Sequence, residues 1–231
     1  MKIVPCAWGY VVPLLIAGAG VALWGLWWLG LPVLIVAGWV LWFFRDPERP
    51  LPQDPDAVVC PADGRVCAVG ETVHPDFPDG RARYMAIFMN VFNVHVQAAP
   101  LDGIVTRVEY RPGEFLHAET DKASERNEAN DLWLDTAVGP VLVRQIAGRV
   151  ARRIVCRARP GDRLRRGEKF GLIRFGSRVE VFVPLSMELG VRVGQRVNHT
   201  TTVIGRAPIE SKPVGGGAAA GRTGEAGVYH C

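Results

Sequence analysis

Hydrophobic residues are distributed very unevenly along this chain of 231 residues. From Cys6 to Phe44 the sequence contains no charged residue. A single membrane-spanning helix needs about 20 apolar residues, so this stretch fits two short spans better than one. Tryptophans near both ends and in the middle suit the interfaces of such a hairpin, which would turn between Gly25 and Gly30. We therefore predict a membrane-anchoring helical hairpin over residues 1–44, with a single tilted or interfacial segment as the alternative.

After the hairpin, the pattern changes to short apolar runs separated by Gly, Pro and Asp. Residues 45–57 are rich in Pro and charge, and predict a linker. Five later runs have the composition of β-strands: 83–97, 103–110, 139–148, 152–158 and 170–184. Glycine turns of similar spacing at 159–173 and 189–205 are typical of barrel-sandwich folds. We expect a mainly β, barrel-sandwich-like domain over residues 58–210 and a disordered tail over 211–231.

The cysteines and the charged residues indicate where this domain is located and what it binds. The five cysteines form no Cys-x-x-Cys pair, so neither a disulfide framework nor a zinc site is indicated, and we expect no metal. Lys2 before the hairpin, with Arg45 and Arg49 after it, favours a cytoplasmic position for both ends. From Arg144 to Arg178 there are twelve Lys or Arg residues but only two acidic ones. This bias favours anionic lipid headgroups over nucleic acid, because interleaved aromatics are scarce; a solvated basic face would give the same pattern.

The dipeptide Gly176-Ser177 lies inside the run 170–184, which otherwise reads as one continuous strand. Gly-Ser normally marks a turn. However, a serine hydroxyl held in a strand is close enough to attack the preceding carbonyl, which converts the amide to an ester. Glycine leaves that carbonyl open and permits strained backbone angles. β-Elimination of the ester would then break the chain and leave a new N-terminal residue that becomes a pyruvoyl group.

This path requires a base and a group that orients the base. His95 follows the alternating pattern of a predicted strand, and Asp63 lies in a Pro-x-Asp-Gly turn that enters a strand. Both residues also have ordinary interpretations, since a strand histidine is more often structural and Asp-Gly is a common turn dipeptide. Composition alone does not distinguish His95 from the four other histidines.

Four motifs in order resemble the short-form phosphatidylserine decarboxylase proenzymes: CPADGRV (60–66), VFNVHVQ (91–97), NEAN (127–130) and RFGSRVEVFVP (174–184). The resemblance runs from about residue 40 to residue 206. It implies that the chain cuts itself between Gly176 and Ser177, giving a β chain of residues 1–176 and an α chain of residues 177–231. It also implies that Ser177 becomes the pyruvoyl cofactor, and that Asp63, His95 and Ser177 form the self-processing triad.

The same resemblance implies an activity in membrane phospholipid synthesis. Phosphatidylserine would be decarboxylated to phosphatidylethanolamine through a Schiff base between its amine and the pyruvoyl group, with His95 in proton transfer. The implied partners are phosphatidylserine, anionic membrane lipids and the two chains of the cut protein, which form a heterodimer or a higher oligomer. The implied location is the cell membrane, with the catalytic domain on its cytoplasmic face. Arg174 and Arg178 are candidates for the substrate carboxylate and phosphate; solubility of a strand edge explains each arginine equally well.

Two residues depart from related sequences. Phe92 stands where the long forms have an additional histidine, so the role of that histidine does not carry over to this chain. Glu180 stands where aspartate is common, which is a mild change. Two other functions fit parts of the pattern: a membrane-anchored binding module without catalysis, and a pyruvoyl decarboxylase for a soluble amino acid. The latter would have no need of a membrane anchor.

Overall fold

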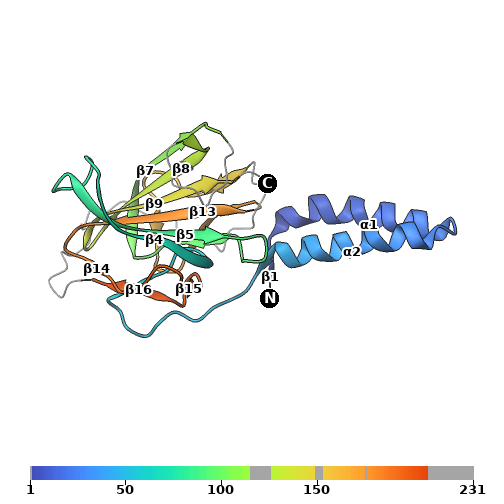
Figure 1. Ribbon diagram of the computed structural model, residues 1–231, viewed down its shortest axis with the longest axis horizontal. Coiled ribbons are helices and arrows are strands. Elements are labelled where there is room, and N and C mark those ends of the chain that lie inside the picture. The colour runs from blue at the N-terminus through green and yellow to red at the C-terminus, as the bar shows by residue number, and fades with distance from the viewer. Residues whose placement is uncertain (1, 115–125, 149–152, 175, 208–231) are drawn as a thin grey trace. The chain divides into compact units, whose positions relative to one another are not determined.

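The computed structural model describes residues 2–114, 126–148, 153–174 and 176–207 (Figure 1). Its contacts divide the chain into two compact units, of which the first includes residues 1–48 and the second begins at Arg49. The tail predicted over 211–231 lies outside the described residues. The domain bounds expected from the sequence therefore stay predictions.

The first unit is a helical hairpin, as the sequence predicted. Its helices are η1 (Pro5–Ala7), α1 (Trp8–Leu23) and α2 (Trp27–Phe43), and the short strands β1 (Lys2–Ile3) and β2 (Arg45–Asp46) pair antiparallel beside its open end. The turn between the helices uses Gly25 at a φ of +85°, a left-handed conformation that glycine adopts readily. A Cβ added to Gly30 would lie 2.5 Å from the carbonyl oxygen of Gly18. The two helices therefore pack closely because both positions are glycine.

The two helices of the hairpin are strongly apolar. The segment Pro5–Leu23 is a helix long and apolar enough to cross a membrane, whereas α2 is shorter, with 17 residues. Large apolar side chains such as Ile16 and Trp24 are exposed. The chain thus has a long apolar N-terminal helix, and a full crossing by both helices stays a prediction.

The second unit is mainly β, again as expected, and is built around a curled antiparallel sheet of eight strands (Figure 1). In spatial order the strands are β11 (Arg163–Leu164), β7 (Gly103–Arg111), β8 (Ala129–Thr136), β9 (Gly139–Ala147), β13 (Ser177–Val183), β5 (Arg81–Met89), β4 (Gly64–Val73) and β15 (Arg196–Val197). Two smaller sheets complete the unit. They are β10 (Ile154–Cys156), β12 (Lys169–Ile173) and β6 (Val96–Ala98), and β14 (Glu188–Leu189), β16 (Val203–Arg206) and β3 (Ala57–Val59).

Strand β13 is central in the large sheet and buries both of its faces. Its side chains alternate between the two faces, as in any strand. Val179, Val181 and Val183 belong to the main hydrophobic core, whereas Phe182 belongs to a second cluster with Phe77 and Trp133. By the same alternation Ser177 shares the face of the main core, and Arg178 and Glu180 share the face of Phe182.

The prediction of one continuous strand over 170–184 is wrong. Strand β12 ends at Ile173 and pairs with β10 and β6, while β13 begins at Ser177 and pairs with β9 and β5. Gly176 has a φ of +54°, which a pleated strand does not accommodate, so the chain leaves one sheet and enters another at this point. His95 likewise lies just before β6 rather than within a strand.

The residues predicted as a linker are in part fixed to the β unit. The guanidinium of Arg166 donates hydrogen bonds to the carbonyls of Asp54 (2.6 Å), Pro55 (3.0 Å), Ala57 (2.8 Å) and Pro52 (3.3 Å). Backbone carbonyls of an extended segment otherwise need water. Arg166 therefore ties residues 52–57 to the β unit, and we call this segment the Arg166 strap.

Candidate functional site

Gly176 and Ser177 lie where β13 enters the large sheet. Ser177 is opposite Met89 of β5 on one side and Ala147 of β9 on the other. Its side chain is fully buried, and its hydroxyl donates to the sulfur of Met89 at 3.5 Å. A thioether is a weak acceptor, so this contact orients the hydroxyl without holding it strongly. The left-handed backbone of Gly176 directly precedes it.

His95 is buried, with 3% of its surface exposed. Its Nδ1 lies 3.0 Å from the carbonyl oxygen of Asn93. A carbonyl can only accept, so Nδ1 carries a proton, and in the neutral imidazole Nε2 then carries the lone pair. The imidazole is therefore held in the tautomer in which Nε2 can act as a base.

Asp63 lies at the end of the turn before β4 and is buried. Its two carboxylate oxygens accept hydrogen bonds from Nη1 and Nη2 of Arg49, at 2.5 and 2.7 Å. The backbone N–H of His199 also donates to Oδ1 at 2.8 Å. Such a two-pronged arginine pair with an added backbone donor fixes the carboxylate in one orientation.

Two further groups beside Asp63 are held neutral by burial. The pKa of His199 is lowered to about 4, mainly by burial; Asp63 opposes this shift, and Arg49 and Lys169 contribute to it. Burial also raises the pKa of the Cys60 thiol to about 12. We call Asp63, Arg49, His199 and Cys60 the Asp63 corner. It combines one ion pair, between Arg49 and Asp63, with two groups that stay uncharged at neutral pH.

The structure links Ser177 to His95 through intervening side chains, whereas Asp63 has hydrogen-bond partners of its own. Ser177 and His95 are linked through Met89 and Gln97, because the Gln97 amide donates to the His95 carbonyl at 2.9 Å and approaches the Met89 sulfur at 3.8 Å. The hydrogen bonds of the Asp63 carboxylate to described residues go instead to Arg49 and His199. A triad of Asp63, His95 and Ser177 therefore stays a prediction.

The two arginines beside the dipeptide are not solvated at a strand edge. Arg174 and Arg178 have only 6% and 3% of their surface exposed, and Arg178 lies on a strand that is paired on both sides. The Nε of Arg178 lies 2.9 Å from Glu180, which also lies 3.8 Å from Arg144. Several members of the basic stretch thus serve buried ion pairs, and headgroup binding by Arg174 and Arg178 stays a prediction.

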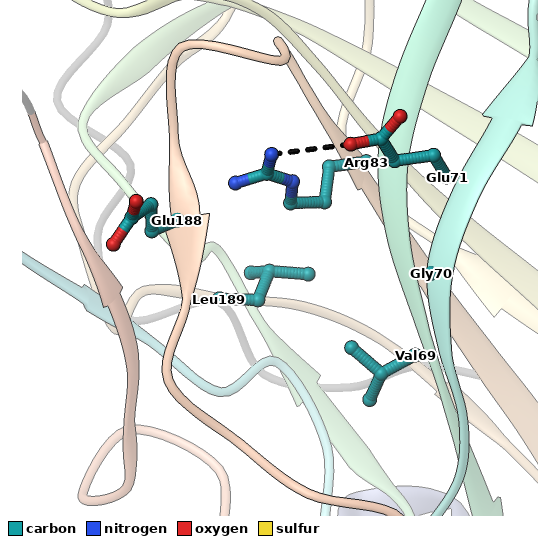
Figure 2. A pocket seen from close by; sticks show the side chains of 6 residues that line it. All are labelled: Val69, Gly70, Glu71, Arg83, Glu188 and Leu189. Carbon is teal, nitrogen blue, oxygen red and sulfur yellow. Dashed lines mark hydrogen bonds and ion pairs between the residues drawn. The ribbon is translucent and has the colours of Figure 1, made fainter.

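A pocket of about 350 Å³ is lined by residues of β4, β5 and β14 (Figure 2). Glu71 and Arg83 form an ion pair at its wall. Arg83 is opposite Val183, whereas Ser177 is opposite Met89, six residues further along β5. At ~3.3 Å per residue the pocket is roughly 20 Å from the dipeptide, and none of the predicted site residues lines it. Among the described residues, no group of three or more His, Cys, Asp or Glu side chains is placed to hold a metal ion.

Comparison with known proteins gives one consistent result. The family described as phosphatidylserine decarboxylase matches residues 36–205. A protein of Magnetococcus marinus named phosphatidylserine decarboxylase proenzyme is 50% identical over 173 residues, which is 74% of this chain and 79% of the relative. One of Burkholderia multivorans with the same name is 49% identical over 174 residues, covering 75% and 81%.

The chain belongs to the phosphatidylserine decarboxylase family. It is therefore a decarboxylase, and the resemblance found in the sequence motifs is confirmed. The sequence analysis did not single out Arg49, Met89, Gln97 or His199 as site residues. Arg49 lies in a stretch that predicts only a linker. Gln97 ends the motif VFNVHVQ (91–97), whereas Met89 and His199 lie outside the four motifs.

One signal in the sequence of this phosphatidylserine decarboxylase homologue does bear on Asp63. The pattern Pro-x-Asp-Gly-x-Val occurs twice, at residues 61–66 and 100–105. In both copies the aspartate accepts a backbone N–H, from His199 at 2.8 Å for Asp63 and from Arg166 at 2.6 Å for Asp102. The two turns are thus structural counterparts, although only Asp63 is buried.

Proposed function

We propose that this chain is a proenzyme that cuts itself between Gly176 and Ser177 and then decarboxylates phosphatidylserine to phosphatidylethanolamine. The observation that supports it best is the junction itself. A left-handed glycine precedes a fully buried serine at the first position of a central strand. This junction occurs in a chain that is 50% identical to a protein named phosphatidylserine decarboxylase proenzyme.

The cut needs no water at the peptide bond. Ser177 Oγ attacks the carbonyl carbon of Gly176 while Nε2 of His95 takes the hydroxyl proton, and the C–N bond breaks as the departing nitrogen gains a proton. The resulting ester joins Gly176 to Oγ. Removal of the α-proton of Ser177 then expels Gly176 as a carboxylate. The dehydroalanine left at the new N-terminus tautomerises, and water replaces its nitrogen, which leaves as ammonia.

The residues around Ser177 fit a pyruvoyl group. Pairing with Met89 and Ala147 fixes the backbone of residue 177 on both sides, and its burial keeps bulk water away. When formed, the pyruvoyl group supplies a carbonyl that condenses with the substrate amine and takes up the electrons released with carbon dioxide. His95 is placed to hold and return a proton. Asp63, which is held in place by Arg49, would influence this proton transfer through its negative charge.

A lipid substrate agrees with the first unit of the chain. A long apolar helix with exposed side chains provides anchorage in a bilayer, and phosphatidylserine is presented only at such a surface. We place the catalytic unit on the cytoplasmic face because Lys2, Arg45 and Arg49 flank the hairpin. The two chains produced by the cut would remain together, since β13 pairs with strands of the other chain on both sides.

Denaturing mass spectrometry of the purified chain tests the cut. We expect a fragment of residues 177–231 whose N-terminus is blocked by a pyruvoyl group, and an intact chain for Ser177→Ala. Incubation with phosphatidylserine vesicles and, separately, with free serine then identifies the substrate. Release of carbon dioxide from the vesicles alone supports the proposal. An uncut wild-type chain would indicate a binding module, and activity on free serine would indicate a decarboxylase for a soluble amino acid.

A further inference from the structure

Three buried amide side chains form a continuous line through the core. Nδ2 of Asn130 on β8 donates to Oε1 of Gln145 on β9 at 3.0 Å, and Nε2 of Gln145 donates to Oε1 of Gln97 on β6 at 2.9 Å. Gln97 and Gln145 are fully buried, and Asn130 is 4% exposed. We call these three residues the amide relay. It joins the large sheet to the small sheet that contains β6.

The relay has a fixed direction. Gln145 accepts from Asn130 and donates to Gln97, so the oxygen and nitrogen of Gln97 cannot exchange places without breaking the bond to Gln145. Gly171 leaves the necessary space, because a Cβ there would lie 2.9 Å from the Gln145 nitrogen. Burying three amides is costly unless all are partnered, and here the last donor, Nε2 of Gln97, is directed at the candidate site.

That last donor contacts a neighbouring atom of each candidate reacting group. Nε2 of Gln97 donates to the backbone carbonyl of His95 at 2.9 Å and lies 3.8 Å from the sulfur of Met89. The same sulfur accepts the hydroxyl of Ser177 at 3.5 Å. One amide therefore contacts the backbone of the candidate base and the acceptor that orients the candidate nucleophile.

We propose that Gln97 is a positioning residue for the self-cleavage step, with its amide oriented by Gln145 and Asn130. The relay holds the His95 backbone and the Met89 sulfur at a fixed separation, so that the Ser177 hydroxyl lies where the base can reach it. This inference rests on the proposed function, since it concerns the rate of the proposed cut. Misplacement of reacting groups by about 1 Å can lower a rate about 100-fold.

The test measures the first-order rate of cutting in newly synthesised chains, by pulse labelling and denaturing gels, together with unfolding midpoints. Gln97→Met keeps the side-chain length but removes the donor, and we expect cutting to slow at least about tenfold. The matched control is Thr136→Val, which removes a partly buried hydrogen bond to Gly139 (2.7 Å) at the far end of the β8–β9 hairpin. It should lower the unfolding midpoint while cutting proceeds at close to the wild-type rate.

Gln145→Glu separates positioning from simple stability. The ionised carboxylate of this variant cannot donate to Gln97, so the Gln97 amide rotates and its oxygen is turned toward the His95 carbonyl. Protonation restores the donor, and burial favours the protonated form. We therefore expect the ratio of variant to wild-type cutting rates to rise as the pH falls from about 8 to about 5, whereas Gln145→Met shows no such recovery.

The outcomes are distinct. If the wild-type chain is never cut, the proposed function fails and the role of the relay fails with it. If the wild type is cut and Gln97→Met is cut at the same rate, only the relay is overturned. The proposal would also be overturned if Thr136→Val slowed cutting as much as Gln97→Met, or if the rate ratio of Gln145→Glu to wild type did not change with pH. Either result would show that the relay contributes only to core packing.

Discussion

The turns before β4 and β7 share the sequence Pro-x-Asp-Gly but have different surroundings. Asp63 and Asp102 each accept the N–H of a residue that precedes a left-handed one, Thr200 at a φ of 68° and Gly167 at 79°. Asp102 is exposed, whereas Asp63 is buried against Arg49. Accepting the N–H is thus what the turn requires of any aspartate. Burial and the arginine pair are what the Asp63 corner adds, and these additions mark it as the candidate site.

The largest effect should follow from removing the cation. Arg49→Leu leaves a buried carboxylate without its partner, and we expect the free energy of unfolding to fall by about 3 kcal/mol in urea denaturation. Adding Asp63→Asn to this variant should recover most of the loss, because the asparagine oxygen still accepts the His199 N–H without a charge. A double variant as unstable as Arg49→Leu would contradict this account.

Acid should affect the Asp63 corner through His199. Its pKa is about 4 in the folded chain, against about 6.5 when unfolded. The unfolded state thus binds the proton first, so stability is complete above about pH 6.5 and falls by about 3 kcal/mol as the pH approaches 4. His199→Gln should remove this part of the decline, measured as the difference between the two curves of unfolding free energy against pH. Parallel curves would show that His199 does not titrate as described.

Exchanging each aspartate for asparagine tests the comparison most directly. Asp63→Asn keeps the acceptor for the turn but loses the charge, and we expect self-cleavage to slow about 100-fold. Asp102→Asn makes the same chemical change in the counterpart turn and should cut at the wild-type rate. Pulse-labelled chains on denaturing gels give both rates. Equal rates for the two variants would show that the turn, rather than its added partners, matters.

The smallest effect concerns Cys60, which occupies the place that Ala99 has in the other turn. With a pKa of about 12, only about one thiol in 10,000 is ionised at pH 8, and the thiolate is the reactive form. We expect no alkylation of Cys60 by iodoacetamide in the folded chain and full alkylation after denaturation, measured by mass spectrometry. Rapid labelling of folded protein would show that the corner is open.

Sequence patterns predicted the hairpin, the mainly β unit and the family, because these depend on long-range periodicity and on specific motifs. They failed at the junction, where alternation on both sides of Gly176 concealed a change of sheet. Alternation describes the faces of a strand and carries no information about which neighbours it pairs with. Arg49 was missed for a similar reason. Its partner Asp63 is set by tertiary contact, and the local composition around Arg49 indicates only a linker.

The same limit explains the interpretation of Arg178. In sequence it belongs to a basic stretch, but β13 lies between two other strands, so the charge is buried and paired with Glu180. His95 was placed in a strand because its neighbours alternate, although it lies just outside β6. The strand-edge alternative for Arg178 and the strand position of His95 fail where pairing partners, rather than residue types, decide exposure and backbone conformation.

The Arg166 strap determines where the N-terminal helical hairpin of this protein could be exchanged for another segment. Because four carbonyls within residues 52–57 are bonded to one guanidinium, this segment is part of the folded enzyme unit and not an interchangeable spacer. A chimera joined after Glu48 would retain both the strap and the cation of Asp63. One joined after Ala57 would lose both while appearing, from composition, to have kept the whole domain.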